Sequence, residues 1–260
     1  MIGFIGGGNM AEALIKGMAL RNIYVSEPSE QRRGYISATY VVNTTDDNKE
    51  LAVKSDIIIL AVKPQIVSGI AEELASVDLS QKILISIAAG VSISYLSHAF
   101  KTNNVVRVMP NTPALVLKGM SVISAAEGIS LETMTLVEGI FLSIGRVCRL
   151  PEAQMDAVTA VSGSGPAFIA FFAEAMITGG IALGLDDETA SMLTLQTLAG
   201  TSELFSSRSP RSVINMVSSP GGTTVAGLKV MQDRDMAGLV ADVLRAAALR
   251  SAELNIKVSK

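Results

Sequence analysis

Short apolar runs recur along residues 1–149, separated by turn residues and by stretches with helical spacing. The runs are rich in Val, Ile and Leu, which is typical of strands that are buried on both faces of a sheet. Segments such as Met10–Leu20 and Ile66–Leu74 instead have the spacing of amphipathic helices. The predicted strands are 2–5, 23–26, 57–62, 83–87, 105–109 and 121–124. Strands that alternate with helices predict a doubly wound, mainly parallel sheet, because parallel strands need crossover connections.

After Arg149 the strand-like runs stop, and Gly, Pro, Ser and Asp residues separate helical stretches. The predicted helices are 151–161, 166–183, 187–205, 210–217, 223–234 and 236–254. The second of them carries large apolar residues on nearly every side, among them Phe168, Phe171 and Met176, so its surface must be covered. We therefore expect an α/β protein with a sheet domain at 1–149 and an all-helical domain at 150–260 that packs against a second copy.

The composition excludes several partners. With 21 Lys and Arg against 24 Asp and Glu, the chain lacks the basic excess expected of a protein that binds nucleic acid. Its one cysteine, Cys148, permits no intrachain disulfide, and the N-terminal residues, which include Glu12 and Lys16, do not look like a signal peptide. Apolar runs such as Ile57–Val62 stop short of the roughly 20 residues that a membrane helix needs. We expect a cytoplasmic protein that binds neither nucleic acid nor a membrane.

Gly6, Gly8 and Ala11 form the pattern Gly-x-Gly-x-x-Ala directly after the first predicted strand, at the start of a helix. Glycine loops bind dinucleotides in this context. Gly6 permits the tight turn, Gly8 lets the backbone approach a pyrophosphate, and the small Ala11 lets the helix pack on the strand. The pattern predicts a Rossmann-type domain for NADH or NADPH. The alternatives are FAD, for which the domain is short, and a tight turn without a ligand.

The end of the second predicted strand bears on the choice between NADH and NADPH. Glu27 stands where an acidic side chain hydrogen-bonds the 2′-hydroxyl of the adenosine ribose and repels a 2′-phosphate. Ser26, Ser29, Arg32 and Arg33 suit a phosphate instead, if Glu27 points away. The sequence leaves both cofactors open, and the two arginines are equally well explained as solvated surface charges.

Three further loops follow predicted strands, at the edge where ligands of such sheets collect. They are Ala61–Pro64, Ser86–Gly90 and Met109–Pro113. Small residues in the second loop let a flat ring lie against the backbone, and prolines stiffen the other two. We expect these loops to line the nicotinamide half of the site; plain strand-to-helix turns are the alternative for each.

In the helical part, Ser218–Thr224 leads into the helix predicted from residue 223. Two glycines free the backbone to approach a ligand, the helix start presents unpaired N–H groups, and Ser219 and Thr224 add hydroxyls. This arrangement suits a substrate carboxylate, and a capped helix after a glycine turn is the alternative. Ser162–Pro166 has the same ambiguity between a helix entry and a loop that faces substrate.

The residues missing from the helical part indicate the reaction class. Enzymes that oxidise alcohols commonly use a His or Lys as acid-base group, and neither occurs between Lys118 and Lys229. The one histidine, His98, falls on a peripheral predicted helix. A protonated imine needs no such group, because its carbon is already electrophilic. We therefore expect imine reduction, with the Thr224 hydroxyl hydrogen-bonded to the ring nitrogen.

Five motifs, in order along the chain, resemble the pyrroline-5-carboxylate reductase family. They are Gly3–Ala11, Ala61–Pro64, Val106–Pro113, Ser162–Ala167 and Ser218–Thr224. The resemblance implies hydride transfer from NAD(P)H to pyrroline-5-carboxylate, giving L-proline, by a Rossmann domain followed by a helical dimerisation domain. It also implies homodimers, which in this family often assemble further into decamers.

The resemblance adds site residues to Gly6, Gly8, Ala11 and Glu27. It places Asn9 and Met10 at the pyrophosphate, Asn48 at the adenosine, and Ala61, Lys63, Pro64, Ile87 and Ala89 along the rest of the cofactor. It places Ser219, Gly222, Thr223 and the catalytic Thr224 at the substrate, and it implies no metal. Two features depart from the family pattern. Glu27 stands where many members carry a serine or another partner of the 2′-phosphate, and residues 207–215 are less charged than usual.

Two other functions fit parts of the sequence. A β-hydroxyacid dehydrogenase looks similar in both halves, but it needs a catalytic lysine, and residues 119–228 contain none. A degenerate homologue that binds a dinucleotide without turnover is the non-enzymatic alternative. The intact substrate motifs argue against it.

Overall fold

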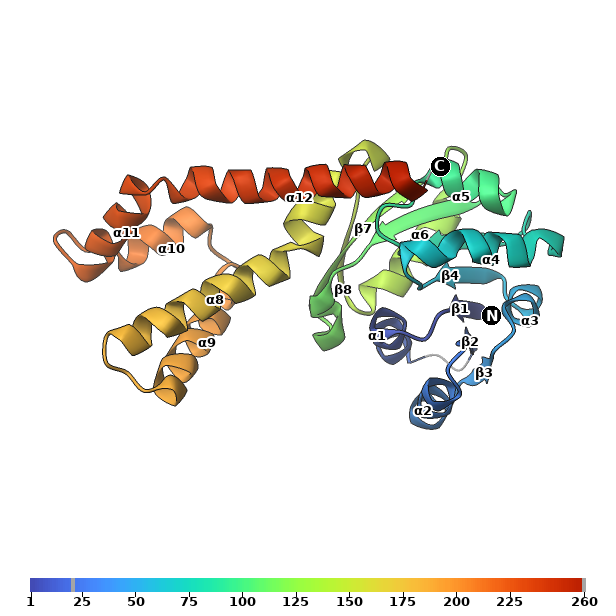
Figure 1. Ribbon diagram of the computed structural model, residues 1–260, viewed down its shortest axis with the longest axis horizontal. Helices are drawn as coiled ribbons and strands as arrows, with labels where there is room; N and C mark the ends of the chain where they lie inside the picture. Colours follow the sequence, from blue (N-terminus) through green and yellow to red (C-terminus); the bar gives the residue numbers. More distant parts are fainter. Residues whose placement is uncertain (20–21, 259–260) are drawn as a thin grey trace. The chain divides into compact units, whose positions relative to one another are not determined.

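The computed structural model describes the backbone of residues 1–19 and 22–258 and the side chains as far as Leu254. The described residues form two compact units, one of residues 1–164 with 245–258 and the other Gly165–Leu244 (Figure 1). Residues 150–164 and the C-terminal residues group with the sheet, whereas the sequence suggests domains at 1–149 and 150–260. The domain boundary after residue 149 stays a prediction.

Eight strands of the described residues form one sheet in the order β3-β2-β1-β4-β5-β6-β7-β8. They are β1 (Ile2–Ile5), β2 (Ile23–Ser26), β3 (Asn43–Thr45), β4 (Ile57–Leu60), β5 (Ile83–Ser86), β6 (Val105–Met109), β7 (Gly119–Ala125) and β8 (Gly145–Arg149). Neighbouring strands are parallel except β6 and β7. The prediction of a doubly wound, mainly parallel sheet is confirmed, and the strand order reverses between β1 and β4.

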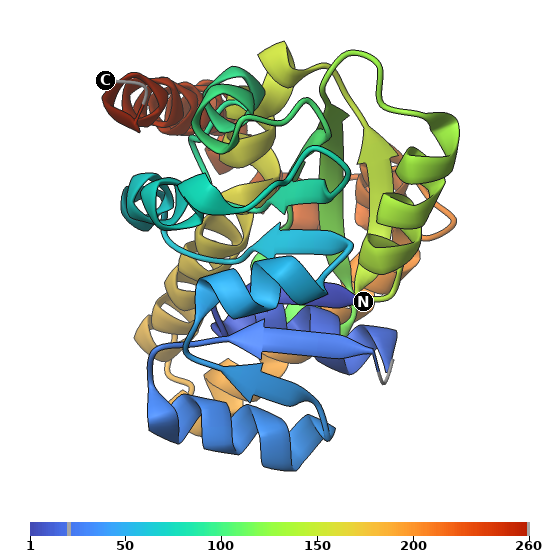
Figure 2. The same cartoon turned by 90° about the vertical axis from the view of Figure 1, so that its right-hand side faces the viewer.

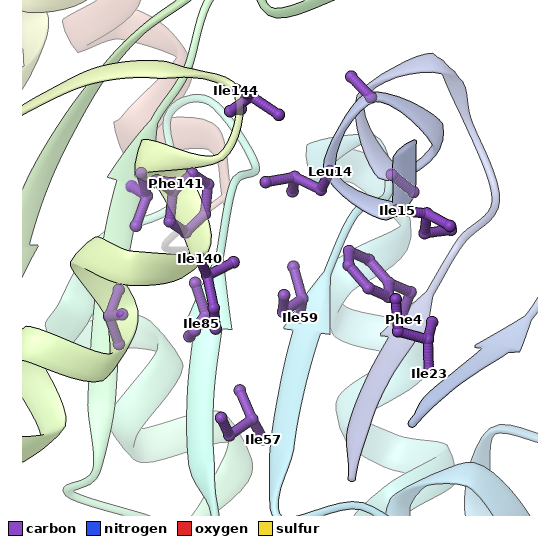
Figure 3. Close-up of a cluster of buried hydrophobic side chains, with 14 of the residues drawn as sticks. Phe4, Leu14, Ile15, Ile23, Ile57, Ile59, Ile85, Ile140, Phe141 and Ile144 are labelled. Atoms are coloured by element: carbon purple, nitrogen blue, oxygen red, sulfur yellow. The ribbon is translucent and has the colours of Figure 1, made fainter. Parts of the chain in front are cut away.

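Helices cover both faces of this sheet (Figure 2). One face carries α1 (Asn9–Met18), α2 (Glu30–Tyr40) and α6 (Leu131–Leu142), and the other carries α3 (Asn48–Lys54), α4 (Val67–Glu73) and α5 (Ile93–Phe100). Figure 3 shows the first core, where Leu14 of α1 and Phe141 of α6 meet Phe4 and Ile59 of the strands. Leu60, the next residue along β4, belongs to the opposite core. Burial on both faces is the reason why the strands are almost continuously apolar.

The six predicted strands all form, and the structure adds two that the pattern missed. β3 and β8 are the edge strands of the sheet. β3 consists of Asn and Thr residues, and β8 exposes Arg146 and Arg149. Edge strands are solvated on one side and carry polar residues, so they lack the apolar signal of the central strands. The predicted helix Met10–Leu20 is α1, which ends at Met18, while Leu20 lies outside the described residues.

The helix predicted at 151–161 forms from residue 152, but not all of its turns are regular α-helix. The segment consists of a 3-10 turn (Glu152–Gln154), α7 (Met155–Val158) and a π-helical turn (Thr159–Gly163), in which the Ser164 N–H donates to the Thr159 carbonyl at 2.8 Å. Gly163, the last residue of this turn, and Gly165 both weaken the preference for a continuous α-helix. Further 3-10 turns lie at Pro64–Ile66, Leu74–Ser76 and Thr112–Val116.

The second unit is helical, as predicted. It contains α8 (Gly165–Ala182), α9 (Asp187–Leu204), α10 (Pro210–Val217), α11 (Thr223–Asp233) and the first part of α12 (Met236–Val258). Side chains cap two of the starts, because Asp186 accepts from the Thr189 N–H and Ser209 accepts from the Ser212 N–H. Gly184, at φ +100°, allows the turn between α8 and α9.

Much of the apolar surface of α8 is exposed in this single chain. The exposed fractions of Ile169 and Phe171 are 62% and 72%, and in α8 only Ala173 is buried. In the part of the chain that the structure describes, the helical stretch Glu152–Ala182 is long and apolar enough to cross a membrane by length and composition alone. The expectation of short apolar runs concerns unbroken runs, and this stretch contains none of that length. Serines and glycines divide the stretch into shorter apolar runs, but its mean hydropathy stays high.

Gly145→Ala is expected to lower the free energy of unfolding by about 2–4 kcal/mol. Gly145 has φ +150°, and a Cβ there would overlap the backbone of Gly119 on the neighbouring strand. Gly139→Ala is the control, because it lies in α6 with open space around the added Cβ and is expected to raise stability slightly. Urea denaturation of both variants tests this, and equal stabilities would contradict it.

Candidate cofactor and substrate sites

The expected cofactor residues come together where the strand order reverses. Ile5 of β1, Leu60 of β4 and Ser86 of β5 lie side by side in the sheet register. The ladder continues one residue further, since the Ala61 N–H donates to the Ile5 carbonyl at 2.8 Å and the Ile87 N–H donates to the Leu60 carbonyl at 3.2 Å. The carboxyl ends of these strands, and the loops that follow them, therefore share one edge.

The glycine loop fits a dinucleotide at this edge. Gly6 has φ +98°, and a Cβ at this position would stand 2.6 Å from the Ala61 carbonyl oxygen, so only glycine fits. Gly8 is exposed, no other residue lies within 4 Å of the place of its Cβ, and no side chain caps α1 there. Ala11 of α1 is fully buried, as close packing of this helix on the sheet requires. The open backbone over Gly8 and the uncapped N–H groups of α1 make a cradle for a pyrophosphate.

Glu27 points towards the glycine loop. Its carboxylate accepts hydrogen bonds from the Gly7 N–H at 2.9 Å and from the Ser29 N–H at 3.0 Å. A Cβ at Gly7 would be 3.3 Å from the Cβ of Glu27, so the two residues pack closely. The half-buried Glu27 carboxylate is thus held at the carboxyl end of β2, where the ribose of a dinucleotide is expected.

Arg32 is held by an acid on α1. Its Nε donates to the Gly7 carbonyl at 2.6 Å, and its guanidinium forms an ion pair with the Glu12 carboxylate. Tyr35 and Tyr40 also donate to Glu12, at 2.9 and 2.7 Å. Burial alone would raise the pKa of Glu12, but the hydrogen bonds from Tyr40, Arg32 and Tyr35 outweigh it and lower that pKa. The sequence carried no sign of this cluster, because an acid in the first turn of a helix is common.

The adenosine side has a second polar cluster. Asn48, at the start of α3, accepts from the Ser26 hydroxyl and donates to Glu73 of α4, both at 2.7 Å. Arg33 donates to the Glu27 carbonyl at 2.7 Å and pairs with Asp46 at 3.3 Å. Asn48 thus lies close to the end of β2, as its expected role at the adenosine requires.

Of the other expected cofactor residues, Asn9 and Met10 begin α1, and the rest follow β4 and β5 at the same edge. Asn9 and Lys63 are exposed, while Met10, Pro64 and Ala89 are half-buried. Asn111, after β6, takes part in a contact that the sequence did not reveal. Its side-chain amide donates to Ser162 at 3.2 Å, and its oxygen accepts from the Met120 N–H at 2.8 Å. This joins the loop after β6 to the π-helical turn at Thr159–Gly163.

The expected substrate residues lie together in the second unit, Ser219 and Gly222 in the loop before α11 and Thr223 and Thr224 as its first residues. Gly221 has φ +70°, and the Gly222 N–H donates to the Ser219 carbonyl at 3.0 Å. A Cβ at Gly222 would be 2.5 Å from the Ser219 Oγ, so a side chain there would have to displace the Ser219 hydroxyl. No side chain caps α11, and its first-turn N–H groups are available to an anion. The cofactor residues belong to the first unit and the substrate residues to the second.

A glycine loop at the reversal point of a doubly wound sheet, followed by helices with exposed apolar faces, defines a Rossmann-type dinucleotide-binding protein with a helical second part. The model described as "Pyrroline-5-carboxylate reductase dimerisation" matches residues 152–254, and that described as "NADP oxidoreductase coenzyme F420-dependent" matches residues 1–90. The chain is 40% identical to the pyrroline-5-carboxylate reductase of Synechocystis sp. over 98% of both chains. It belongs to the pyrroline-5-carboxylate reductase family.

Solved structures agree with this assignment. The chain matches a pyrroline-5-carboxylate reductase from Coxiella burnetii with a TM-score of 0.91 at 34% identity, over 97% of both chains. It matches the pyrroline carboxylate reductase of Plasmodium falciparum, which has NADP bound, with a TM-score of 0.86 at 33% identity over 98% of this chain and 97% of the other. The family resemblance and the fold class predicted from the sequence are confirmed, including a helical part of the dimerisation type.

Gly6→Ala and Gly8→Ala are expected to differ in their effects. Gly6→Ala forces a Cβ against Ala61 at positive φ and should lower both stability and cofactor affinity. Gly8→Ala has room in the protein and should fold normally, but it should weaken NAD(P)H binding about tenfold or more because it blocks the approach of the pyrophosphate. Thermal melting and cofactor titration separate the two effects. Unchanged binding by Gly8→Ala would contradict this placement of the pyrophosphate.

The Glu12 cluster should make stability depend on acid pH. Because the pKa of Glu12 is lowered in the folded chain, its contribution is present above the ordinary glutamate pKa of about 4.3 and is lost as pH falls through the folded-state pKa. Glu12→Gln should therefore destabilise the chain most above that value and progressively less below it. Urea denaturation of both proteins at several pH values measures this difference, and a difference independent of pH would contradict it.

Proposed function

We propose that this chain reduces 1-pyrroline-5-carboxylate to L-proline with NAD(P)H, the last step of proline biosynthesis. The observation that carries this proposal is the 40% identity to a pyrroline-5-carboxylate reductase over 98% of both chains. A relationship of that extent covers both the glycine loop of the first unit and the Ser219–Thr224 loop of the second.

NAD(P)H supplies the hydride. The glycine loop and the start of α1 hold the pyrophosphate, Asn48 and Glu27 lie at the adenosine side, and the loops after β4 and β5 line the rest of the cofactor. The first N–H groups of α11 and the Ser219 hydroxyl hold the substrate carboxylate. The Thr224 hydroxyl accepts a hydrogen bond from the protonated ring nitrogen, so positioning rather than acid-base chemistry supplies most of the rate.

The assembly belongs to the same proposal. The helical part forms a homodimer, and the exposed apolar residues of α8 and α9 are the surface that a second copy covers. Assembly of the dimers into decamers, a cytoplasmic location, and the lack of nucleic-acid and membrane partners are further parts of the proposal. The dimer accounts for the apolar stretch Glu152–Ala182 without a membrane.

The expected reaction is consumption of NADH or NADPH that depends on pyrroline-5-carboxylate. Each cofactor is followed separately by its absorbance, with 3-hydroxyisobutyrate and the oxidised cofactors as the control for a β-hydroxyacid dehydrogenase. No consumption of either reduced cofactor with pyrroline-5-carboxylate would contradict the proposed function. Turnover of 3-hydroxyisobutyrate alone would favour the dehydrogenase.

Thr224→Ala is expected to lower kcat by about 10²–10³-fold, because it removes a hydrogen bond aimed at the reacting imine. Cofactor affinity should be unchanged, since Thr224 lies in the substrate loop. Thr135→Ala is the matched control, because its exposed hydroxyl donates only to the Leu131 carbonyl of its own helix. Wild-type kcat in Thr224→Ala would remove this residue from the mechanism.

A further inference from the structure

We infer that this chain selects NADH over NADPH, and that Glu12 is a positioning residue for this choice because it withholds Arg32 from the adenosine ribose. The inference rests on the proposed function, namely that the glycine loop binds a nicotinamide dinucleotide. It concerns Glu27, which accepts from the Gly7 N–H, and Glu12 of α1, which reaches the Gly7 carbonyl only through its partner Arg32.

Glu27 supplies the first half of the selection. One carboxylate oxygen accepts from the Gly7 N–H of the glycine loop, and the other accepts from the Ser29 N–H at the start of α2. Each oxygen keeps a second lone pair with which it can accept a hydrogen bond from a ribose hydroxyl. A 2′-phosphate at the same place carries no hydroxyl to donate and adds negative charge next to an ionised carboxylate. To admit it, Glu27 must turn away and lose both N–H partners.

Arg32 is one of the two cations beside Glu27 and the glycine loop that a 2′-phosphate could use, and it already has partners. It donates to the carbonyl of Gly7, the residue whose N–H binds Glu27. Its charge is paired with Glu12, which Tyr35 and Tyr40 fix from two further directions. The side chains of Arg32 and Glu12 are only 28% and 21% exposed, so solvent competes weakly for this pair. The hydrogen bonds that lower the pKa of Glu12 keep it ionised at neutral pH.

Arg33 has its own partners. One of its guanidinium nitrogens donates to the carbonyls of Glu27 and Pro28, at 2.7 and 2.8 Å, and the other pairs with Asp46. Both arginines that the sequence offered to a 2′-phosphate therefore already have acidic partners. A 2′-phosphate would compete with Glu12 or Asp46 for the charge of these arginines and would have to displace Glu27, whereas NADH requires neither change.

The experiment measures the dissociation constants of NADH and NADPH by calorimetry at one fixed ionic strength. In the wild type we expect NADH to bind at least about tenfold more tightly. Glu27→Ser should shift the ratio towards NADPH by about tenfold or more, and Glu12→Gln by about threefold, because it releases the charge of Arg32. Glu30→Gln is the control for the loss of one acid at this surface. Glu30 is exposed at the start of α2, and its variant should leave the ratio unchanged.

A double variant separates positioning from simple structural support. If Glu12 acts through Arg32, the shift caused by Glu12→Gln should disappear in Glu12→Gln/Arg32→Gln. A loosened fold would instead weaken both cofactors equally in either background. Glu27→Ser tests the other acid independently, should Glu12→Gln fail to fold.

NADPH binding as tight as NADH binding in the wild type would overturn the inference, and so would a Glu12→Gln ratio equal to that of Glu30→Gln. Failure of both cofactors to bind would overturn it together with the proposed function. Tight and selective NADH binding without turnover of pyrroline-5-carboxylate would support the inference and contradict only the reaction.

Discussion

The close approach of Gly6 to the end of β4 is the constraint on which the cofactor site depends. Parallel pairing sets the ends of β1, β4 and β5 at one level, and the chain must then turn sharply over β4 to begin α1. The turn leaves no room for a Cβ beside the Ala61 carbonyl and needs positive φ. The same turn aims the uncapped start of α1 away from the sheet, where it can meet a pyrophosphate.

The charges beside this loop are organised by the packing of α1 against α2. Glu12 comes from the first turn of α1, and its partners Arg32, Tyr35 and Tyr40 all come from α2. A partly buried polar cluster stabilises the fold only when its groups have hydrogen-bond partners, and here Glu12 accepts from Arg32, Tyr35 and Tyr40. The cluster therefore has two consequences. It holds α2 next to the glycine loop, and it pairs the charge of Arg32 with Glu12.

The helical unit has a large apolar surface that it cannot bury by itself. α8 is apolar around most of its circumference, and a hairpin with α9 cannot bury all of that surface. Ile169 and Phe171 stay exposed in the single chain, which fits a region of the dimerisation type. The segment Ser219–Thr224, where the substrate is expected, lies in the same unit.

The sequence by itself determined the central sheet and the glycine loop, because both depend on local rules. Strands buried on two faces must be apolar throughout, and a turn at positive φ over a neighbouring strand must be glycine. The sequence pattern did not predict the edge strands β3 and β8 or the π-helical turn before α8. Their residues have only weak local preferences for these structures. The pairing of Glu12 with Arg32 joins residues 20 positions apart on two helices, and the orientation of Glu27 depends on the Gly7 N–H. Only the tertiary structure decided these contacts, because they exist once β1 and β2 have paired and α1 and α2 have packed on one face of the sheet.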